Sequence, residues 1–488
     1  AIDHLGYRWP GKGITINLAP AGLRKEGAAY DLPLALGILA ASGQIEAEGF
    51  GQTLMMGALA LGGSLRHIRG GLALAHAAMV PEIHSLILPP SSAAEAALLP
   101  GATTLGAAHL RDVLDHLSGI RALEPTSCAL PSMLAQQASR PLEPLADIKG
   151  QHRGIAAMAL AAAGGHNVCM VGPPGSGKSL LARAMVGLLP PLTAEEAIEV
   201  NRIHSVSARA GRTSEVVLQR PFRSPHHTIS DVALVGGGSD PRPGEISLAH
   251  AGVLFLDELP EMPRHVLEVL RQPMETSEMT ISRARCTVVF PAAFQLVAAM
   301  NPCPCGMYSN DPKLRKQCSC SRHARQQYIR KVSGPLMDRI DIHLQVDAVP
   351  ASTLMPEPGA LGRERRRQRL HQALEWQQRV RAARDIQRSR NPSGKTNHTL
   401  DGEVLHELAP LDREGSRLLR RCMDHFGFSA RAYTRLLRMS RTLADLEGRG
   451  QVTSVDVAQA IAFRRAGADT EVWLEGQGTT PVPSLFNP

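Results

Sequence analysis

Apolar and polar positions in the first 117 residues alternate in short blocks. Brief apolar runs at residues 14–18, 54–61 and 86–88 are typical of strands, because turn-forming residues bound them. Residues 32–41 and 71–79 instead carry apolar side chains at the spacing of one helix face. We therefore expect a small α/β domain over residues 1–117.

Proline and serine interrupt this pattern over residues 118–145, so we expect a linker there. The residues that indicate it are Pro125, Ser127, Pro131, Ser132, Pro141 and Pro144. From Asp147 onward, strand–loop–helix units with wholly apolar strands follow. This pattern is typical of a parallel α/β domain, because its strands are buried on both faces. We expect that domain over residues 146–350, with inserts at 202–250 and 276–290.

The rest of the chain has helical patterns. Residues 361–395 are a charged helical stretch, and residues 401–467 resemble a helical bundle with Asp401 and Ser454 as N-caps. We expect 351–467 to form a basic helix followed by a helical lid. The Gly- and Pro-containing residues 468–488 are expected to be a loose tail.

Composition excludes several classes of protein. Apolar residues make up 43% and charged residues 20% of the 488, so the chain is neither disordered nor collagen-like. No apolar run reaches about 18 residues, and no secretion signal follows Ala1, so we expect a cytoplasmic protein without a membrane partner. The absence of an initiator Met suggests that the chain begins inside a longer protein.

The net charge of +8 permits a polyanionic partner, but it is unevenly distributed. Residues 1–150 contain 10 basic and 12 acidic residues, whereas residues 361–395 contain 11 basic and three acidic ones. Aromatic residues are only 3%, which argues against binding of single strands by base stacking. A nucleic-acid partner would therefore be held through its backbone.

An apolar strand at residues 167–171 runs into a GxxxxGK[ST] loop and then a helix. Such loops hold the phosphates of a nucleotide with backbone N–H groups at a helix N-terminus. Lys178 is expected to reach the β- and γ-phosphates, and the Ser179 hydroxyl to bind Mg²⁺. The loop residues are Gly172, Pro173, Pro174, Gly175, Ser176, Gly177, Lys178 and Ser179.

Polar residues end the next two apolar strands. Asp257 is expected to hold Mg²⁺ and Glu258 to polarise the attacking water, while Asn301 can orient that water. Arg431 begins a helix of the bundle, where it contacts phosphate or is a helix-surface cation. Together these residues predict hydrolysis of ATP.

Two inserts carry arginines that suit DNA phosphates. Arg220 and Arg223 lie on a Gly- and Pro-rich loop within 202–250, where we interpret the His226–His227 pair as a polar loop rather than a metal site. Arg283 and Arg285 lie at the tip of an expected hairpin over 276–290. For the hairpin, the alternative is a solvated turn.

Four cysteines fall within the expected loop 303–320, spaced as two Cys-x-Cys pairs. Four thiolates suit a structural, tetrahedral Zn²⁺, with inert or disulfide-linked thiols as the alternatives and His323 as a reserve ligand. The expected ligands are Cys303, Cys305, Cys318 and Cys320.

The segments VGPPGSGKS, GVLFLDELPEM, AAMNPCPCG, GPLMDRIDIH and SARAYTRLLRMSRTLADLEG closely resemble the Mg-chelatase-like branch of AAA+ ATPases, and within it ComM-type bacterial helicases. The resemblance covers nearly the whole chain. It implies a homo-hexameric ring driven by ATP that acts on single-stranded or branched DNA, in branch migration during natural transformation, with recombination proteins as possible partners. It also implies that Asn301 is sensor 1, Arg339 the arginine finger and Arg431 sensor 2. Ile148 and Gly150 would lie near adenine.

The front domain resembles the proteolytic domain of Lon, without its catalytic pair. Ala29 and Ala73 stand where that domain has its serine nucleophile and lysine base, so we expect no peptidase activity. ComM-type chains have more residues before ITINLAPA, so part of this domain is expected to be missing. Two alternatives to the helicase remain, a chelatase-type motor that remodels a protein partner and a DNA-binding scaffold without catalysis.

Overall fold

A computed structural model describes residues 1–18, 28–47, 50–138, 143–207, 216–238, 241–283, 286–309, 312–355 and 359–465. Contacts divide the chain into two compact units, 1–138 with 192–219 and 139–191 with 220–488. The sequence predicted residues 202–250 as an insert of the ATPase core, whereas residues 202–219 cluster with the first unit. The helix α9 (Ala194–Ser207), which leads into that segment, begins with a reciprocal cap between Thr193 and Glu196.

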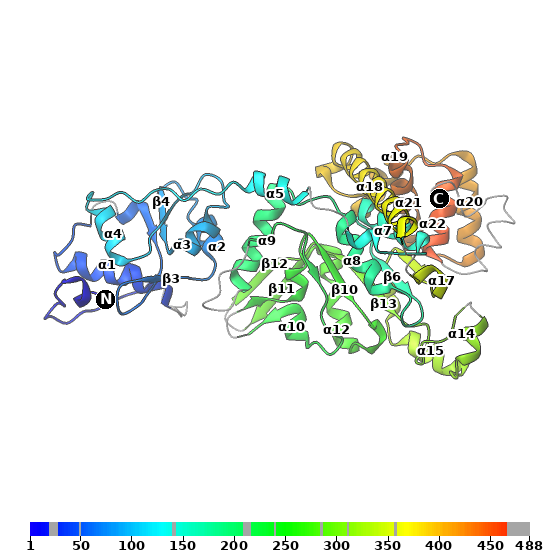
Figure 1. Cartoon of the computed structure of the whole chain (residues 1–488), viewed down its shortest axis with the longest axis horizontal. Coiled ribbons are helices and arrows are strands. Elements are labelled where there is room, and N and C mark those ends of the chain that lie inside the picture. Colours follow the sequence, from blue (N-terminus) through cyan, green and yellow to red (C-terminus); the bar gives the residue numbers. More distant parts are fainter. Residues whose placement is uncertain are drawn as a thin grey trace. The chain divides into compact units, whose positions relative to one another are not determined.

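The first unit contains a three-stranded parallel sheet in the order β1-β4-β5. Figure 1 labels its strand β4 and the helices α1, α2, α3 and α4 of the same unit. Side chains from neighbouring positions of β4 enter different cores: Ile87 packs with helices α1 and α4, and Leu86 with α2 and α3. Helices therefore cover both faces of the sheet. The elements are α1 (Asp31–Ala41), β1 (Thr53–Met55), β2 (Ala58–Leu59), β3 (Leu65–Arg66), α2 (Gly71–Ala77), β4 (Ser85–Leu88), α3 (Pro90–Ala96), β5 (Thr103–Gly106), α4 (Leu110–Leu117) and α5 (Leu130–Ala138).

Three details of the first unit differ from the predictions. Residues 14–18 form no strand, and Ile16 is 50% exposed, because among the described residues no neighbouring strand bonds to this backbone. The run 54–61 is divided between β1 and β2. The expected linker contains the helix α5, in which Pro131 occupies the first turn, where no backbone N–H is required.

The second unit contains a five-stranded sheet in the order β14-β6-β13-β10-β7, with every neighbouring pair parallel. This confirms the α/β content and the parallel sheet predicted from the apolar strands. The strands are β6 (Val168–Val171), β7 (Phe222–Arg223), β10 (Val253–Leu256), β13 (Gln295–Met300) and β14 (Ile342–Gln345).

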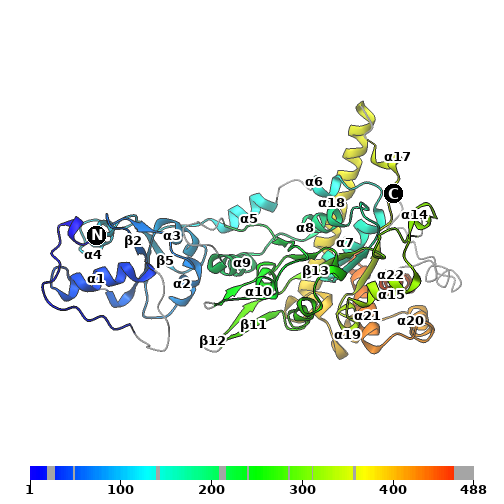
Figure 2. The same ribbon diagram turned by 90° about the horizontal axis from the view of Figure 1, so that it is seen from below.

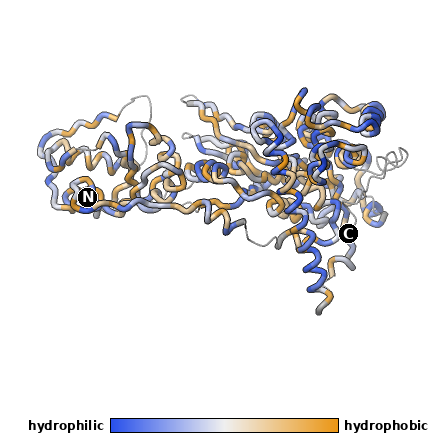
Figure 3. Tube along the Cα trace, turned by 90° about the horizontal axis from the view of Figure 1, so that it is seen from above, coloured by the Kyte–Doolittle hydropathy of each residue, from blue (hydrophilic) through white to orange (hydrophobic). Residues whose placement is uncertain are grey.

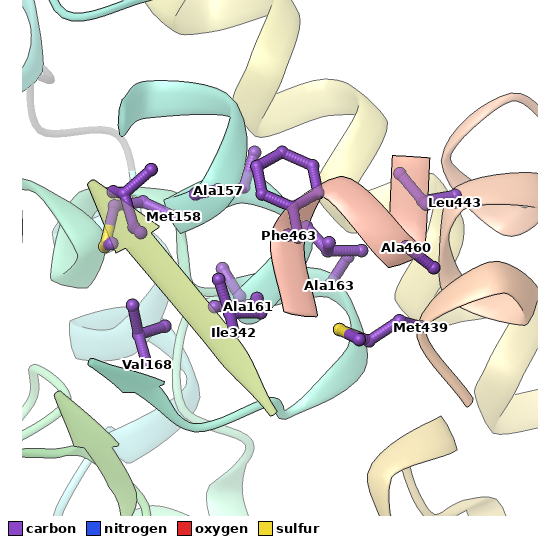
Figure 4. Close-up of a cluster of buried hydrophobic side chains, with 14 of the residues drawn as sticks. Ala157, Met158, Ala161, Ala163, Val168, Ile342, Met439, Leu443, Ala460 and Phe463 are labelled. Carbon is purple, nitrogen blue, oxygen red and sulfur yellow. The ribbon is translucent and has the colours of Figure 1, made fainter. Parts of the chain in front are cut away.

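The core of this unit joins the sheet to the C-terminal helices (Figure 4). Helix α7 presents small side chains such as Ala157 and Ala161, which let strand residue Ile342 and lid residue Phe463 pack around it. The helices on this side are α6 (Glu143–Ala146), α7 (His152–Gly164), α8 (Lys178–Leu188), α18 (Gly359–Arg390), α19 (Gly402–Leu408), α20 (Arg413–Phe426), α21 (Ala430–Leu446) and α22 (Ser454–Arg464). The predicted cap Asp401 accepts a bond from Gly402 N, but the cap of α22 is Thr453, one residue before the predicted Ser454.

Helix α18 is the basic helix expected from the charge pattern, and it extends well past the other lid helices (Figure 2). Most of its length is hydrophilic (Figure 3). The remaining elements are α10 (Asp231–Val235), β8 (Gly236–Gly237), β9 (Arg242–Pro243), α11 (Glu245–Leu248), α12 (Arg264–Glu268), α13 (Pro273–Thr276), β11 (Glu278–Arg283), β12 (Cys286–Pro291), α14 (Pro312–Gln317), α15 (Arg322–Arg330), α16 (Gly334–Met337) and α17 (Ala351–Leu354). The predicted tail, 468–488, lies outside the described residues.

Candidate nucleotide-binding and metal sites

The GxxxxGKS segment forms the turn between β6 and α8. Gly175 and Gly177 have φ values of 76° and 93°, which glycine adopts without the strain of a side chain. Gly172 lies so close to the next strand end that a Cβ there would be 2.2 Å from Val346 O. The loop therefore requires these glycines where the sequence places them.

Lys178 is the first residue of α8, and its ammonium group closes the loop. Its Nζ donates to Gly172 O at 2.7 Å and Pro173 O at 2.9 Å, and reaches Asn301 Oδ1 at 3.4 Å. Burial lowers the pKa of Lys178, although Asp257 and Glu258 act in the opposite direction. The predicted lysine and Asn301 thus meet at one edge of the sheet.

The pair expected to bind Mg²⁺ is also assembled. Ser179 Oγ donates to Asp257 Oδ2 at 3.1 Å, and Asp257 Oδ1 accepts from Glu258 N at 2.9 Å. Hydroxyl and carboxylate oxygens are ligands that Mg²⁺ accepts beside phosphate oxygens. These two side chains therefore fit the metal that the phosphate loop implies.

Glu258 follows Asp257 in a left-handed backbone conformation, with φ 52° and ψ 43°. Its Oε2 lies 2.9 Å from His227 Nδ1, a partner that the sequence analysis missed. No local sequence pattern indicates this contact. The pairing and register of β7 and β10 in the structure place the histidine beside the glutamate.

The segment expected near adenine lies against the same loop. Ile148 is buried, and Gly150 has φ 67° where its neighbours are Val349 and Thr353. Gln151, the next residue of this segment, donates from Nε2 to Ser176 O at 3.0 Å and to Asp347 O at 2.8 Å. This amide therefore ties the segment to the phosphate loop.

Arg339 and Arg431 do not join the loop contacts within this chain. Arg339 bonds to Glu275 and donates to Pro335 O at 2.7 Å, and its side chain is only 12% exposed. Arg431 is exposed near the start of α21. One turn further on, Arg435 donates to the buried Asp341 at 2.6 Å.

Asp341 anchors the lid to the sheet, and the sequence analysis missed this role. Its carboxylate accepts from Asn167 N at 3.1 Å before β6, and lies 3.1 Å from His398 Nδ1. Interactions with His398, His166 and Arg435 hold the pKa of Asp341 well below its usual range, despite the opposing effect of burial. These residues come from segments far apart in sequence, so no local pattern indicates them.

The four predicted cysteines come together. Their Sγ atoms all lie within 4.8 Å of one another, with separations such as 3.4 Å for Cys303–Cys305 and 3.8 Å for Cys303–Cys318. Four sulfurs on a tetrahedral Zn²⁺ with Zn–S near 2.3 Å would lie about 3.8 Å apart. Burial raises the pKa of Cys303 to about 12, whereas the backbone N–H of Met307 lowers that of Cys305 to about 6.

The candidate DNA-binding arginines divide into two groups. Arg220 donates to Ala251 O at 2.7 Å, and Arg223 donates two hydrogen bonds of 2.6 Å to Glu245. Both guanidinium groups therefore link separate segments of the chain. The DNA contact of these two arginines stays a prediction. The predicted hairpin forms as β11 and β12, with Arg283 exposed at the end of β11. Arg285 lies outside the described residues.

A parallel sheet with this loop, this acidic pair and a polar third strand end defines a P-loop nucleotide-binding protein. Family models described as "Magnesium chelatase, subunit ChlI", its C-terminal part and "Subunit ChlI of Mg-chelatase" match residues 144–354, 371–464 and 1–92. The chain is 40% identical to "Uncharacterized protein YifB" of Salmonella typhimurium over 466 residues, covering 95% of this chain and 87% of that protein. It is 39% identical to "Competence protein ComM" of Haemophilus influenzae over 464 residues, covering 95% and 88%.

The chain therefore belongs to the Mg-chelatase-like AAA+ family, as a ComM-type member. A more distant relative is the "Magnesium-chelatase 38 kDa subunit" of Cereibacter sphaeroides, 30% identical over 175 residues that cover 33% of this chain and 52% of that protein. Membership of this family implies ATPase activity with ATP and Mg²⁺. Among the described residues, no helix has the length and apolar character to cross a bilayer.

Proposed function

We propose that this chain is a DNA translocase of the cytoplasm that hydrolyses ATP as a homo-hexamer and promotes branch migration of incoming DNA during natural transformation. The observation that carries the proposal is the assembled site at Lys178, Asp257 and Asn301 in a chain 39% identical to a competence protein. The hairpin of β11 and β12 supports it, because Arg283 presents a cation suited to a phosphate backbone.

In the proposed reaction, the phosphate loop and Lys178 hold the triphosphate of ATP. Ser179 and Asp257 would hold Mg²⁺, which neutralises phosphate charge when bound. Glu258 accepts a proton from water, the water oxygen attacks the γ-phosphorus, and the bond to the bridging oxygen breaks to release ADP and phosphate. Asn301 orients the water, Arg339 of a neighbouring copy stabilises the transferred phosphoryl group, and Arg431 contacts phosphate from the lid.

The test is ATP hydrolysis with and without DNA, followed by strand displacement on forked and three-stranded substrates. Lys178→Ala and Glu258→Gln should each abolish both activities. Glu95→Gln, in the first unit, serves as a matched control for replacing a carboxylate. Retained hydrolysis in either site variant would falsify the site assignment, and hydrolysis without strand displacement would contradict the helicase.

The second candidate is a motor that remodels a protein partner. It is favoured by the similarity to the "Magnesium-chelatase 38 kDa subunit" over a third of the chain. The assays with DNA distinguish the two functions. A motor that remodels a protein should show no stimulation of ATP hydrolysis by DNA and no strand displacement.

We also propose that Cys303, Cys305, Cys318 and Cys320 bind one structural Zn²⁺. The support is their mutual spacing and the position of the loop, in which Gly306 packs on Pro174 of the phosphate loop so closely that a Cβ would be 2.7 Å away. A Zn²⁺ bound by four thiolates has no open position, so its role is to stabilise this loop.

We propose that the first unit is a Lon-like domain that assists assembly or DNA contact and has no peptidase activity. Ala29 and Ala73 have methyl side chains, which supply neither a nucleophile nor a base. Lys25–Glu26–Gly27, on which part of the resemblance rests, lies outside the described residues. Incubation with a casein substrate and ATP should release no peptides, and peptide release would contradict this proposal.

A further inference from the structure

The segment that carries the four clustered cysteines and the helices α14 and α15 is strongly basic. Residues 303–331 contain seven basic residues and one acidic residue, Asp311. The helices α14 and α15 form a lobe of the second unit (Figure 1). The basic residues are Lys313, Arg315, Lys316, Arg322, Arg325, Arg330 and Lys331.

Two of these cations hold the lobe together and attach it to the core. Arg325 donates to Cys320 O at 3.0 Å, and its guanidinium carbon lies 4.1 Å from the centroid of the Tyr308 ring. Lys331 Nζ donates to Glu261 Oε2 at 3.1 Å. These two side chains are therefore accounted for by the fold.

Lys316, Arg322 and Arg330 are not accounted for in this way, and we call them the exposed basic surface. All three side chains are exposed, and no carboxylate of the described residues pairs with them. On α15, Arg322 and Arg330 point away from the side on which Tyr328 is buried. Like charges without interspersed carboxylates repel one another, so a polyanion that binds here relieves that repulsion.

The spacing of the three cations suits a nucleic-acid strand. Arg322 and Arg330 lie about 12 Å apart along α15, and six positions of chain keep Lys316 within about 20 Å of Arg322. One strand of DNA carries a phosphate about every 3.4 Å of helix axis, so such a span covers several phosphates. The exposed Ser319 and Gln326 add polar donors, which phosphate oxygens also accept.

The lobe is packed directly on the ATPase site. A Cβ at Gly306 would lie 2.7 Å from Pro174 of the phosphate loop and 3.9 Å from Asn301 Cγ. In addition, Tyr328 of α15 is buried in the same core cluster as Met300, the last residue of β13. Movement of the lobe therefore acts on the segments that hold the phosphates and the attacking water.

We propose that Lys316, Arg322 and Arg330 bind the phosphate backbone of DNA, as a contact separate from the β11–β12 hairpin. Because the lobe packs on Pro174 and Asn301, DNA held here also contributes to stimulation of ATP hydrolysis. The inference rests on the proposed action of this chain on DNA.

The test is binding of a labelled single-stranded oligonucleotide to the full chain, measured by fluorescence anisotropy over a range of salt concentrations. The triple variant Lys316→Ala/Arg322→Ala/Arg330→Ala should bind at least about tenfold more weakly. The slope of log K against log salt should become shallower by about 2, at about 0.7 for each lost phosphate contact. DNA-stimulated ATP hydrolysis should fall, whereas hydrolysis without DNA, zinc content and Tm should match wild type.

Two controls separate this surface from charge in general. Arg322→Lys/Arg330→Lys keeps the cations and should retain most of the affinity. Arg363→Ala/Arg367→Ala/Arg388→Ala removes three exposed arginines from the basic helix α18 and should change affinity by less than about twofold.

Three outcomes overturn the inference. If wild type binds DNA and the triple variant binds it equally well, the inference fails and the proposed function stands; weaker self-association of that variant would then indicate a contact between copies. Equal losses in the triple variant and in the α18 control indicate a general effect of charge. A wild-type chain that binds no DNA overturns both the inference and the proposed function.

Discussion

Lys178 Nζ lies 3.4 Å from Asn301 Oδ1, although 123 positions separate the two residues in the chain. The contact exists because β6 and β13 are neighbours, and Asn301 follows β13 at the edge where β6 enters the phosphate loop. The pairing of these two strands thus brings together the cation proposed to bind phosphate and the amide proposed to orient water.

Replacement of Asn301 by Ala should lower kcat for ATP hydrolysis by about ten- to a hundredfold, because the amide acts on the attacking water. Affinity for a non-hydrolysable ATP analogue should change little. Steady-state kinetics and fluorescent nucleotide titration measure the two quantities. A wild-type kcat would remove Asn301 from the site.

Nucleotide binding should be accompanied by proton uptake at alkaline pH. Burial lowers the pKa of Lys178 in the free protein, and the negative phosphates should raise it again. Between the two pKa values the complex holds a proton that the free protein lacks, so affinity falls as pH rises. Calorimetry in buffers of different ionisation enthalpy measures the uptake. Lys178→Arg should abolish it, because arginine stays charged.

The purified chain should contain about one zinc per molecule, measured by elemental analysis. Cys303→Ser should reduce this content and lower the Tm, whereas Cys128→Ser, outside the cluster, should retain the metal. Full zinc content in Cys303→Ser together with Cys318→Ser would contradict the site.

Acid should destabilise the second unit through His343. Burial lowers the pKa of this histidine from 6.5 to about 4, so below pH 6.5 the unfolded state binds the proton more readily than the folded state. Stability is therefore lost as pH falls from 6.5 towards 4, by about 2 kcal/mol at pH 5. Urea unfolding of wild type and His343→Gln at pH 7.5 and pH 5 measures the difference, and identical acid sensitivity of the two proteins would contradict it.

Mixing two inactive variants tests whether Arg339 acts on a neighbouring copy. Arg339→Ala and Lys178→Ala should each be inactive alone, since one lacks the finger and the other the phosphate-binding lysine. Mixed rings contain some interfaces with an intact loop and an intact finger, so part of the activity should return. No recovery, with mixed assembly shown by light scattering and crosslinking, counts against a site shared between subunits.

Local patterns predicted much of the nucleotide site. The GxxxxGKS loop has glycines at 172, 175 and 177 because the backbone there adopts positive φ or touches another strand, and the sequence records that requirement directly. Asp257 and Asn301 were found because polar residues end apolar strands, and the ends of parallel strands share one edge of a sheet.

Local patterns failed where a contact depends on partners far away in the chain. The run at 14–18 reads as a strand, but a strand needs a neighbour for its backbone hydrogen bonds, and the described part of the chain supplies none. Arg220 and Arg223 were predicted only to suit DNA phosphates, and no local pattern indicated that Ala251 O and Glu245 accept hydrogen bonds from them.

The sequence by itself determined which candidate chemical groups this protein carries, namely the phosphate loop, the acidic pair and the four thiols, because each consists of particular residues at close spacing. Only the tertiary structure decided which charges are free to act and which are held, as with His227 on Glu258 and Arg435 on Asp341. The physical reason is that strand order and register bring distant residues within hydrogen-bond distance, and neither is encoded at any single position of the chain.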